Sequence, residues 1–323
     1  MTRVATMLTA SVAASAFAAA AAHAQSVDPD LPSYEAASGV SGNLVSIGSD
    51  TLNNQMTLWS EGFRNFYPNV AIQIQGAGSG TAPPALVEGT AQFGPMSRPM
   101  RDSEIEEFEA RFGYEPLAMR GAIDALGVFV HRDNPLECLS LQEVDAIFSS
   151  TRAGGADAAI TTWGDAGLDG DWADRPIALY GRNSASGTYG YFRDVALFGG
   201  DYSPDVREQP GSSTVIQGVA SDANGIGYSG VGYATADVRA LEIRGDDGEC
   251  YSTDDAPTGL YPLARFLYIY MNVDPNAEME PLRAEFVRYV YSQEGQEDVV
   301  RAGFFPVNQR VAEQDLSDFG ILD

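Results

Sequence analysis

The sequence predicts an α/β fold with two lobes, and three observations lead to that prediction. Apolar strand-like runs alternate with amphipathic helix-like segments between residues 44 and 302, an alternation typical of helix-covered sheets. The chain is long enough for two domains of ~100–200 residues each. Strand-like runs in two separate parts of the chain end in loops rich in glycine, serine and threonine. Because ligands of open α/β sheets bind beyond the carboxyl ends of strands, these loops predict two lobes facing across a cleft.

The first 24 residues have the features of a secretory signal peptide. Arg3 supplies a basic start, residues 12–22 form a short alanine-rich apolar stretch, and Ala22-His23-Ala24 is a small-residue cleavage site. The stretch is shorter than the ~20 residues of a membrane-spanning helix, so we expect cleavage near Ala24 and not an N-terminal anchor. Since no later apolar run reaches ~18 residues, we expect a secreted, soluble mature protein.

Residues 25–102 open with a polar stretch, 25–41, that we expect to be a loose N-terminus. Strands are expected at 44–47 and 70–74. A helix is expected at 52–66 and a short one at 83–88. The longer helix has one apolar face with residues spaced by three and four, and Pro68 follows it. That face is formed by Leu52, Met56, Trp59, Phe63 and Phe66.

The middle of the chain continues the alternation. Ser103 and Glu106 have capping-box spacing, which predicts a helix over 103–112 that starts at Ser103. A buried strand at 125–131 and an amphipathic helix at 139–148 come next, and the Gly/Asp/Ala-rich stretch 149–174 is expected to be an irregular surface excursion.

The last part of the chain supplies further strands and helices. Alternating aromatic residues predict the strand 265–271, and two helices are expected to close the chain. The other expected strands are 177–180, 226–228 and 241–244. The expected helices are 188–198, 213–220, 281–292 and 293–302.

The charge balance excludes some classes of partner. The chain has 45 aspartates and glutamates against 19 basic residues, all of them arginine, for a formal net charge of −26. Such a charge argues against nucleic acid or an anionic membrane as a partner. It leaves a small anionic ligand open, because charges beyond a Debye length of about 8 Å are screened while groups in a cleft act at contact range. We interpret the acid excess as a solvation trait.

The chain has two cysteines, Cys138 and Cys250, both in the exported part. In an oxidising compartment we expect them to form a disulfide, with two buried free thiols as the alternative. His131 is the only histidine beyond the expected signal peptide, so a Cys/His zinc site is not expected and we predict no metal and no cofactor.

Three loops, at residues 47–51, 75–81 and 180–188, share glycine, serine and threonine next to an expected helix start. Glycine allows close approach of the backbone, hydroxyls donate, and a helix N-terminus presents unpaired N–H groups. Arg182 in the third loop has a planar fork that matches a tetrahedral oxyanion, and Ser186 and Thr188 add donors. The alternative for this segment is a capping loop with a surface arginine.

Four other residues near these loops are weaker candidates. Ser79 and Ser97 are expected ligand donors, whereas Thr51 is either a helix cap or a donor. Arg98 is expected either to reach the anion or to brace its loop against Asp50 or Asp102.

The remaining polar candidates do not suggest catalysis. Asp124 and Asp222 are expected to be solvated or capping acids, and His131 a hydrogen-bonded strand histidine. A Ser/His/Asp site would need His131 as its base, and no Gly-x-Ser-x-Gly elbow accompanies it.

With these motifs the chain resembles the periplasmic phosphate-binding proteins that serve ABC phosphate importers, over about residues 42–307. The resemblance implies a type 2 periplasmic-binding-protein fold, in which two lobes with mostly parallel, helix-flanked sheets are joined by two crossover hinge strands. Here the crossovers are expected near 120–124 and 262–266, with the signal peptide at 1–24, lobe I at 25–122 plus 263–323, and lobe II at 123–262. The matching motifs are residues 48–51, 75–79, 92–94, 182–188 and 225–228.

The resemblance also implies a set of phosphate ligands, to which Ser97 and Arg98 are added from their position in the loop. Ser97 stands where the family pattern has an aspartate that accepts the phosphate proton, a group that separates phosphate from sulfate. We name Asp50 as a possible replacement acceptor. The expected ligands are Thr51, Leu52 through its backbone, Ser79, Ser97, Arg98, Arg182, Ser186, Gly187 and Thr188.

The function expected from this resemblance is capture of inorganic phosphate in the periplasm and its delivery to a membrane ABC permease, by a monomer that performs no chemistry. Two alternatives stay open. One is a binding protein for another tetrahedral oxyanion such as sulfate, arsenate or a phosphonate. The other is a secreted phosphohydrolase, although no metal cluster or activated nucleophile is visible in the sequence.

Overall fold

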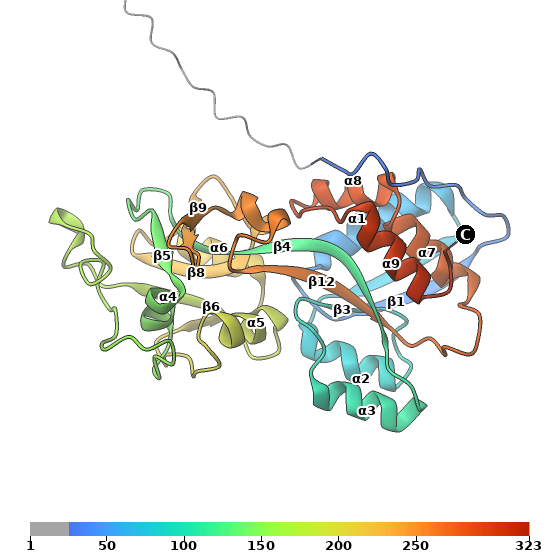
Figure 1. Cartoon of the computed structure of the whole chain (residues 1–323), viewed down its shortest axis with the longest axis horizontal. Coiled ribbons are helices and arrows are strands. Elements are labelled where there is room, and N and C mark those ends of the chain that lie inside the picture. Colours follow the sequence, from blue (N-terminus) through green and yellow to red (C-terminus); the bar gives the residue numbers. More distant parts are fainter. Residues whose placement is uncertain (1–25, 323) are drawn as a thin grey trace, which may run out of the picture.

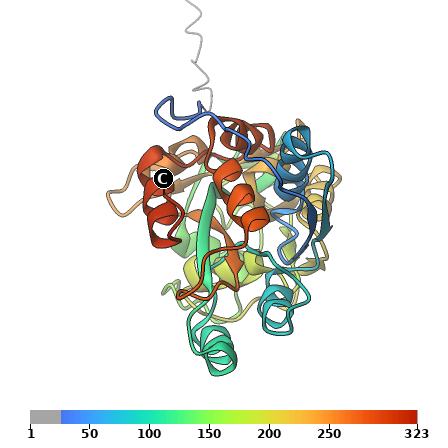
Figure 2. The ribbon, with the colours of Figure 1, turned by 90° about the vertical axis from the view of Figure 1, so that its right-hand side faces the viewer.

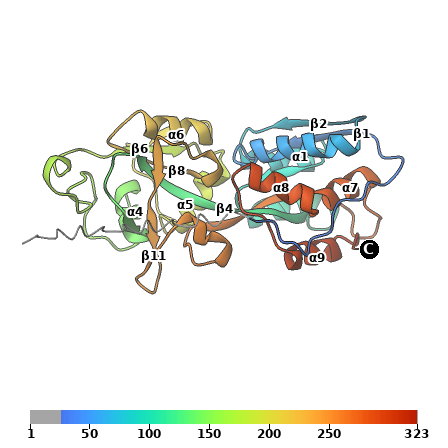
Figure 3. The same ribbon diagram turned by 90° about the horizontal axis from the view of Figure 1, so that it is seen from above.

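Two halves lie side by side along the long axis of the molecule, joined by two long strands (Figures 1 and 3). The computed structural model describes residues 26–322, so the expected signal peptide lies outside the described residues. The joining strands are β4 (Leu117–His131) and β12 (Ala264–Met271), which pair antiparallel with Arg265 opposite Asp124. We call the half with the elements of residues 42–112 and 281–318 lobe I, and the half with those of residues 138–258 lobe II. This is the α/β, two-lobed architecture that the sequence predicts.

Lobe I contains a two-stranded parallel sheet, and its helices surround the strands in the end-on view (Figure 2). Short β3 pairs with β12, which links this lobe to the crossover strands. The elements are β1 (Gly42–Ile47), α1 (Asn53–Phe66), β2 (Val70–Gln75), η1 (Ser79–Thr81), α2 (Ala82–Val87), β3 (Gly94–Met96), α3 (Asp102–Phe112), α7 (Pro281–Val290), α8 (Gln293–Arg301) and α9 (Gln309–Asp318).

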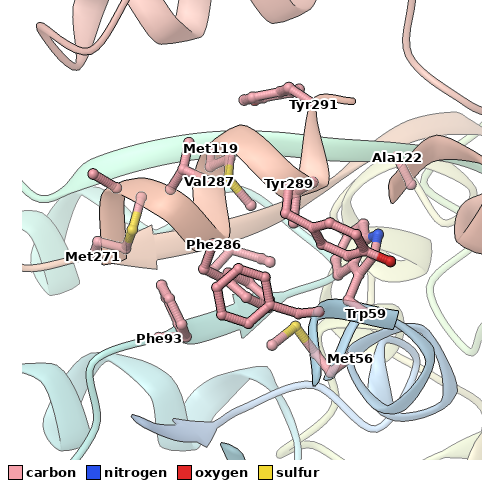
Figure 4. Close-up of a cluster of buried hydrophobic side chains, with 14 of the residues drawn as sticks. Met56, Trp59, Phe93, Met119, Ala122, Met271, Phe286, Val287, Tyr289 and Tyr291 are labelled. Atoms are coloured by element: carbon pink, nitrogen blue, oxygen red, sulfur yellow. The ribbon is translucent and has the colours of Figure 1, made fainter. Parts of the chain in front are cut away.

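The core of lobe I forms where the apolar face of α1 meets α7 and the crossover strands (Figure 4). Met56 and Trp59 of α1 are fully buried with Phe286 of α7, and the Trp59 indole N–H donates to the Gly295 carbonyl. The predicted apolar face of α1 is confirmed except at its end, where Phe66 is 37% exposed. Burying each such side chain contributes roughly 1.5–3 kcal/mol, which fixes α1 and the loop that precedes it.

Lobe II has a separate core and carries most of a seven-stranded sheet that continues through β4. Strand β6 pairs parallel with β7 and β8, whereas β4 pairs antiparallel with β8 and β9. The sheet is therefore mixed, because the crossover strands run against their neighbours. The elements are β5 (Cys138–Ser140), α4 (Leu141–Phe148), η2 (Gly170–Trp172), β6 (Ala178–Arg182), α5 (Gly187–Val195), β7 (Arg207–Gln209), α6 (Ser212–Ala220), β8 (Gly225–Gly230), η3 (Val231–Tyr233), β9 (Val238–Ala240), β10 (Glu242–Arg244), β11 (Cys250–Tyr251) and η4 (Thr253–Thr258).

A disulfide joins Cys138 and Cys250, as predicted, with Cα atoms 6.3 Å apart. It lies in the small sheet of β5, β10 and β11, where β10 pairs with both partner strands. The link spans 112 residues of sequence, so it restricts the unfolded chain over most of lobe II.

The N-terminal segment is packed, which corrects the expectation of a loose stretch over residues 25–41. Leu31 is 2% and Tyr34 8% exposed, and the Tyr34 hydroxyl donates to Glu285 of α7 at 2.6 Å. These two buried side chains and the hydrogen bond to Glu285 hold the N-terminal segment on lobe I. The sequence did not predict this packing because Leu31 and Tyr34 stand among many polar residues.

Several elements differ from the sequence predictions, and strand β4 begins at Leu117 where a start at 125 was expected. Helix α3 begins at Asp102, and Glu104 accepts the backbone N–H of Arg101, so the predicted Ser103 cap is wrong. Residues 138–140 are a strand that pairs with β10, and α4 begins only after Ser140. A third helix, α9, closes the chain, where two helices were expected.

No helix among residues 26–322 combines the length and apolar character needed to cross a membrane.

Candidate functional site

Loops from both lobes bring five buried side-chain hydroxyls together, and we call these the hydroxyl cluster. The Thr51 Oγ1 lies 2.8 Å from Thr188 Oγ1 of lobe II, which makes this a contact between lobes. Ser97 Oγ lies 3.3 Å from Ser79 Oγ and 3.4 Å from Thr188 Oγ1. Hydroxyls rotate to suit a partner and each can donate one proton, so the cluster suits an anion. The members are Ser49, Thr51, Ser79, Ser97 and Thr188.

Glycines at the strand ends let these loops approach one another. A Cβ on Gly48 would lie 2.1 Å from the Pro95 carbonyl oxygen, and one on Gly78 would lie 2.5 Å from that of Ala185 in lobe II. The Gly80 N–H donates to the same Ala185 oxygen at 3.0 Å. The Gly/Ser/Thr loops noted in the sequence therefore pack loop against loop, at distances that a side chain would prevent.

Gly187, a predicted ligand, lies against two serines of the opposite lobe. A Cβ at this position would lie 2.2 Å from Ser79 Oγ and 2.8 Å from Ser97 Oγ. The backbone at the start of α5 therefore faces the hydroxyl cluster with no side chain between them. A helix N-terminus carries a partial positive charge, so the start of α5 places this charge next to the hydroxyl cluster.

Ser186 and Leu52, two other predicted ligands, occupy the N-cap positions of their helices. The Ser186 Oγ accepts the N–H groups of Thr188 at 3.1 Å and Tyr189 at 3.4 Å, which caps α5. Leu52 is fully buried at the N-cap of α1, where a backbone N–H has no intrahelical acceptor. Ser186 therefore shapes the helix end and still has its own proton to donate.

Arg182 is the buried cation of the site, with 1% of its side chain exposed. Its Nη1 donates to Ser212 Oγ at 2.8 Å and its Nη2 to the Pro210 carbonyl at 3.1 Å, while its Nε has no hydrogen-bond partner among the described residues. Burial lowers the pKa of Arg182, and the charge of Asp50 offsets part of this effect. A buried guanidinium with donor capacity to spare is what a site for an oxyanion requires.

Asp50 of lobe I is held beside Arg182 of lobe II. Its Oδ2 lies 3.3 Å from Arg182 Nη1 and accepts the Ser212 N–H at 2.8 Å. The Tyr233 hydroxyl donates to the Asp50 carbonyl at 2.8 Å. The acceptor suggested by the sequence is thus adjacent to the predicted cation, and its carboxylate is fixed by contacts from the opposite lobe.

Arg98 is paired differently from the sequence expectation. Its Nη1 and Nη2 donate to both carboxylate oxygens of Glu104 at 2.8 and 2.7 Å, and Nη1 also donates to the Pro99 carbonyl. Neither Asp50 nor Asp102 is its partner. Burial alone would raise the pKa of Glu104, but hydrogen bonds from Arg98 and the Arg101 backbone bring it below its ordinary value. Arg98 therefore braces its loop to α3, and we leave it out of the ligand set that we propose.

Sequence reasoning missed a second buried arginine at the site, Arg265, and misjudged Asp124. Asp124 is fully buried, not solvated, and its Oδ2 accepts from Arg265 Nε at 3.0 Å and Nη2 at 2.7 Å. A signal was present, because Arg265 and Asp124 are charges of opposite sign that each have apolar neighbours on both sides in the sequence. Two such charges favour a buried pair, since an isolated buried charge is very costly.

Ser212 and Tyr233 were also missed as neighbours of the predicted residues. Ser212 follows Gly211 at the start of α6, so it belongs to a fourth loop of the kind recognised in the sequence. Nothing in the local sequence around Tyr233 indicates that its hydroxyl reaches the Asp50 carbonyl.

The described residues do not form an obvious catalytic arrangement. His131 ends β4, and its Nδ1 accepts the Asp133 N–H at 3.2 Å, as expected for a hydrogen-bonded strand histidine. Across residues 26–322 no group of three or more His, Cys, Asp or Glu side chains is placed to hold a metal ion.

The sequence matches a family model described as a PBP superfamily domain over residues 33–294. It is 53% identical to the phosphate-binding protein PstS of Pseudomonas aeruginosa over 305 residues, which cover 94% of each chain. It is 28% identical to the phosphate-binding protein PstS of Bacillus subtilis, covering 86% of this chain and 85% of that one.

Solved structures show the same fold. A phosphate ABC transporter substrate-binding protein from Clostridium perfringens with bound phosphate aligns with a TM-score of 0.69 and 22% identity, covering 82% of this chain and all of that one. An ABC-type phosphate transport receptor from Vibrio cholerae aligns with a TM-score of 0.64 and 21% identity over the same shares of the two chains.

Proposed function

Because this chain belongs to the PBP superfamily and, within it, to the PstS-type phosphate-binding proteins, we propose that it binds inorganic phosphate between its lobes and delivers it to an ABC importer. The protein is an extracytoplasmic binding protein of a phosphate importer and not an enzyme. We further propose that it is a monomer, cleaved near Ala24, with lobe I formed by residues 25–122 and 263–323 and lobe II by residues 123–262.

The observation that carries this proposal is that donors from both lobes gather where the loops of the two lobes meet. Lobe I supplies hydroxyls from three loops, and lobe II supplies a buried guanidinium and the N-terminus of α5. Hydroxyl protons, a guanidinium and the N–H groups of a helix start are groups that bind an oxyanion. The proposed ligands are Thr51, the backbone of Leu52, Ser79, Ser97, Arg182, Ser186, Gly187 and Thr188.

Binding would be coupled to closure because the ligand groups are divided between the lobes. A ligand that touches both lobes stabilises only the conformation in which they meet. The paired strands β4 and β12 are the covalent connection about which the lobes would move. About a dozen donor bonds in a dry site are consistent with a Kd near or below ~1 μM.

Asp50 is the acceptor that we propose for the proton of phosphate. A carboxylate repels an anion that has no proton to share, which separates phosphate from sulfate. Asp50 is the carboxylate nearest to the Arg182 guanidinium, at 3.3 Å, so it lies at the edge of the proposed ligand shell.

A second candidate ligand, another tetrahedral oxyanion, is favoured by one observation. Ser97 provides a hydroxyl in the middle of the cluster, and its Oγ accepts a hydrogen bond from the Ser49 hydroxyl at 3.0 Å. A hydroxyl at this position accommodates an unprotonated oxygen, as sulfate presents, better than a carboxylate does.

Isothermal titration of the mature protein tests both candidates. The protein is first stripped of ligand by unfolding and refolding, and then titrated with phosphate and, separately, with sulfate. We expect a Kd near or below ~1 μM for phosphate and binding of sulfate weaker by at least about 100-fold. Tighter binding of sulfate would assign the protein to the second candidate, and heatless titrations with both anions would overturn the proposal.

A further inference from the structure

A charge pair on the crossover strands lies directly beneath the hydroxyl cluster. Arg265 of β12 is opposite Asp124 of β4 in the antiparallel register, at the point where these strands pass from one core to the other. The Arg265 side chain is 2% exposed and that of Asp124 is 0% exposed. Two charges this deep carry a desolvation cost that only well-directed hydrogen bonds offset.

The remaining hydrogen bonds of Arg265 go to both lobes. Its Nη1 donates to the Ser97 carbonyl oxygen of lobe I at 2.6 Å, and its Nη2 donates to Thr188 Oγ1 of lobe II at 3.0 Å. Both partners belong to the hydroxyl cluster. The Arg265 guanidinium, on a crossover strand, therefore contacts residues of both lobes in the hydroxyl cluster. Arg182 instead contacts Asp50 and Ser212.

The bond to Thr188 fixes the direction of that hydroxyl. A threonine hydroxyl has one proton, and its oxygen already accepts from Arg265. The proton of Thr188 must then be donated elsewhere, toward Thr51 Oγ1 at 2.8 Å, toward Ser97 Oγ at 3.4 Å or toward a ligand. Arg265 thus sets Thr188 as a donor, which is the role that binding of an anion needs.

Asp124 approaches the cluster from the other side. A Cβ on Gly230 would lie 3.2 Å from both Asp124 carboxylate oxygens and 3.2 Å from the Thr51 methyl carbon, so one small gap separates these groups. The Asp124 Oδ1 accepts the Val231 N–H at 3.1 Å. The Arg265 guanidinium also lies 5.1 Å from the ring centroid of Tyr191, on the helix that begins beside the cluster.

We propose that Arg265 is the second arginine of the anion site, a positioning residue that orients Thr188 and the Ser97 peptide. We also propose that Asp124 and the bound anion share the positive charge of Arg265. This inference rests on the proposed function and deepens it. Before an anion arrives, Asp124 alone balances Arg265. An anion in the hydroxyl cluster adds a second negative charge near the same guanidinium, so Asp124 stabilises the free protein and weakens binding.

A purely structural ion pair would behave differently. It would contribute equally to the free and the bound protein, and its removal would lower both melting temperatures by the same amount. Asp124→Asn separates the two roles. It keeps the shape of the side chain and leaves Arg265 charged. We expect the free protein to melt lower, the upward shift in Tm at saturating ligand to become larger than in the wild type, and the affinity to be retained or increased.

The second variant removes both charges at once, which avoids an unpaired buried ion. Arg265→Gln combined with Asp124→Asn leaves a polar pair of similar size. Because Thr188 loses its charged donor, we expect binding about 100-fold weaker than in the wild type. The matched control is Arg120→Gln with Asp315→Asn, a pair in which Asp315 is 4% exposed and which touches none of the hydroxyl cluster. We expect its affinity to stay within about threefold of the wild type.

The experiment titrates all four proteins with phosphate, arsenate and sulfate by calorimetry, and measures Tm with and without the anion that binds best to the wild type. An enlarged Tm shift in Asp124→Asn together with selective loss of affinity in the double variant supports the proposal. An unchanged Tm shift in Asp124→Asn, or a double variant that binds like its control, overturns the proposal while leaving the proposed function intact. A wild type that binds none of the three anions overturns the proposed function, and this inference with it.

Discussion

The segment at residues 97–104 and the segment at residues 180–188 each contain a buried arginine, yet the surroundings of the two arginines differ. Arg98 meets Glu104 of its own lobe in a two-pronged pair at 2.7 and 2.8 Å. Arg182 meets a carboxylate of the opposite lobe at 3.3 Å and retains an unpartnered Nε among the described residues. The comparison indicates that an arginine whose hydrogen-bond partners all lie in its own lobe braces the fold, whereas one that reaches a group of the opposite lobe is placed to serve a site between the lobes.

The largest effect is expected from Arg182→Ala. Removing the guanidinium takes away the cation that we propose to bind the anion directly, so phosphate affinity should fall by at least about 1000-fold. Calorimetry of refolded protein measures this. Arg207→Ala is the control, because Arg207 lies in the same lobe and its side chain is 56% exposed. If Arg182→Ala kept a phosphate affinity within tenfold of the wild type, Arg182 would not be the arginine that binds the anion.

Gly187→Ala tests the close approach of the two lobes. The added Cβ would lie 2.2 Å from Ser79 Oγ, so closure over the ligand is obstructed and we expect about 100-fold weaker binding with little loss of fold stability. Gly190→Ala on the same helix is the control, since its Cβ would meet Arg98 Cδ at 3.2 Å and Arg101 Nη2 at 3.5 Å, neither of which belongs to the hydroxyl cluster. Equal affinities for the two variants would show that the start of α5 does not face the ligand.

Asp50→Asn tests the proposed proton acceptor. The amide can still accept the Ser212 N–H, but it has no negative charge to repel an unprotonated anion. We expect phosphate affinity to fall about tenfold and the preference for phosphate over sulfate to narrow. Competition titrations with the two anions measure the preference, and an unchanged preference would remove Asp50 from the role.

Arg98→Gln should separate stability from binding. Glu104 loses its partner, and the side chains of this pair are only 6% (Arg98) and 18% (Glu104) exposed. The free energy of unfolding should therefore fall by about 2 kcal/mol, while phosphate affinity stays within about threefold of the wild type. Urea denaturation and calorimetry on the same sample measure the two quantities. A large loss of affinity at unchanged stability would return Arg98 to the ligand set.

The smallest effect concerns pH and Glu104. The pKa of Glu104 is below its ordinary value of 4.5 in the folded protein, so its contribution to stability is complete above about pH 4.5 and is lost as the pH falls. Glu104→Gln should therefore make the decline in stability below that pH slightly shallower. Denaturation midpoints from pH 7 to pH 3 measure it, and identical slopes in the two proteins would contradict the assignment.

Much of the site could be predicted because its chemistry is local in sequence. A Gly/Ser/Thr loop after a strand carries its own turn geometry, hydroxyls and helix start, so Thr51, Ser79, Ser97 and Thr188 could be selected without a structure. Their convergence within 3.4 Å confirms that the loops belong together. The same reasoning applied to residues 211–214 would have found Ser212.

Pairing between distant charges could not be predicted in the same way. The sequence offered Asp50 and Asp102 as partners of Arg98, but the start of α3 at Asp102 turns Glu104 toward it. Arg265 and Asp124 are 141 residues apart, and only the antiparallel register of β4 and β12 sets them opposite each other.

The α/β class, the strand-end loops, the disulfide and the anionic class of ligand could all be predicted from the sequence, because each depends on patterns within a short segment or on the count of a rare residue. Only the folded chain shows that Arg182 lies beside a carboxylate of the opposite lobe, whereas Arg98 is paired within its own lobe. A guanidinium is always charged, so its role depends on which carboxylate reaches it, and that is set by strand register and by contacts between lobes.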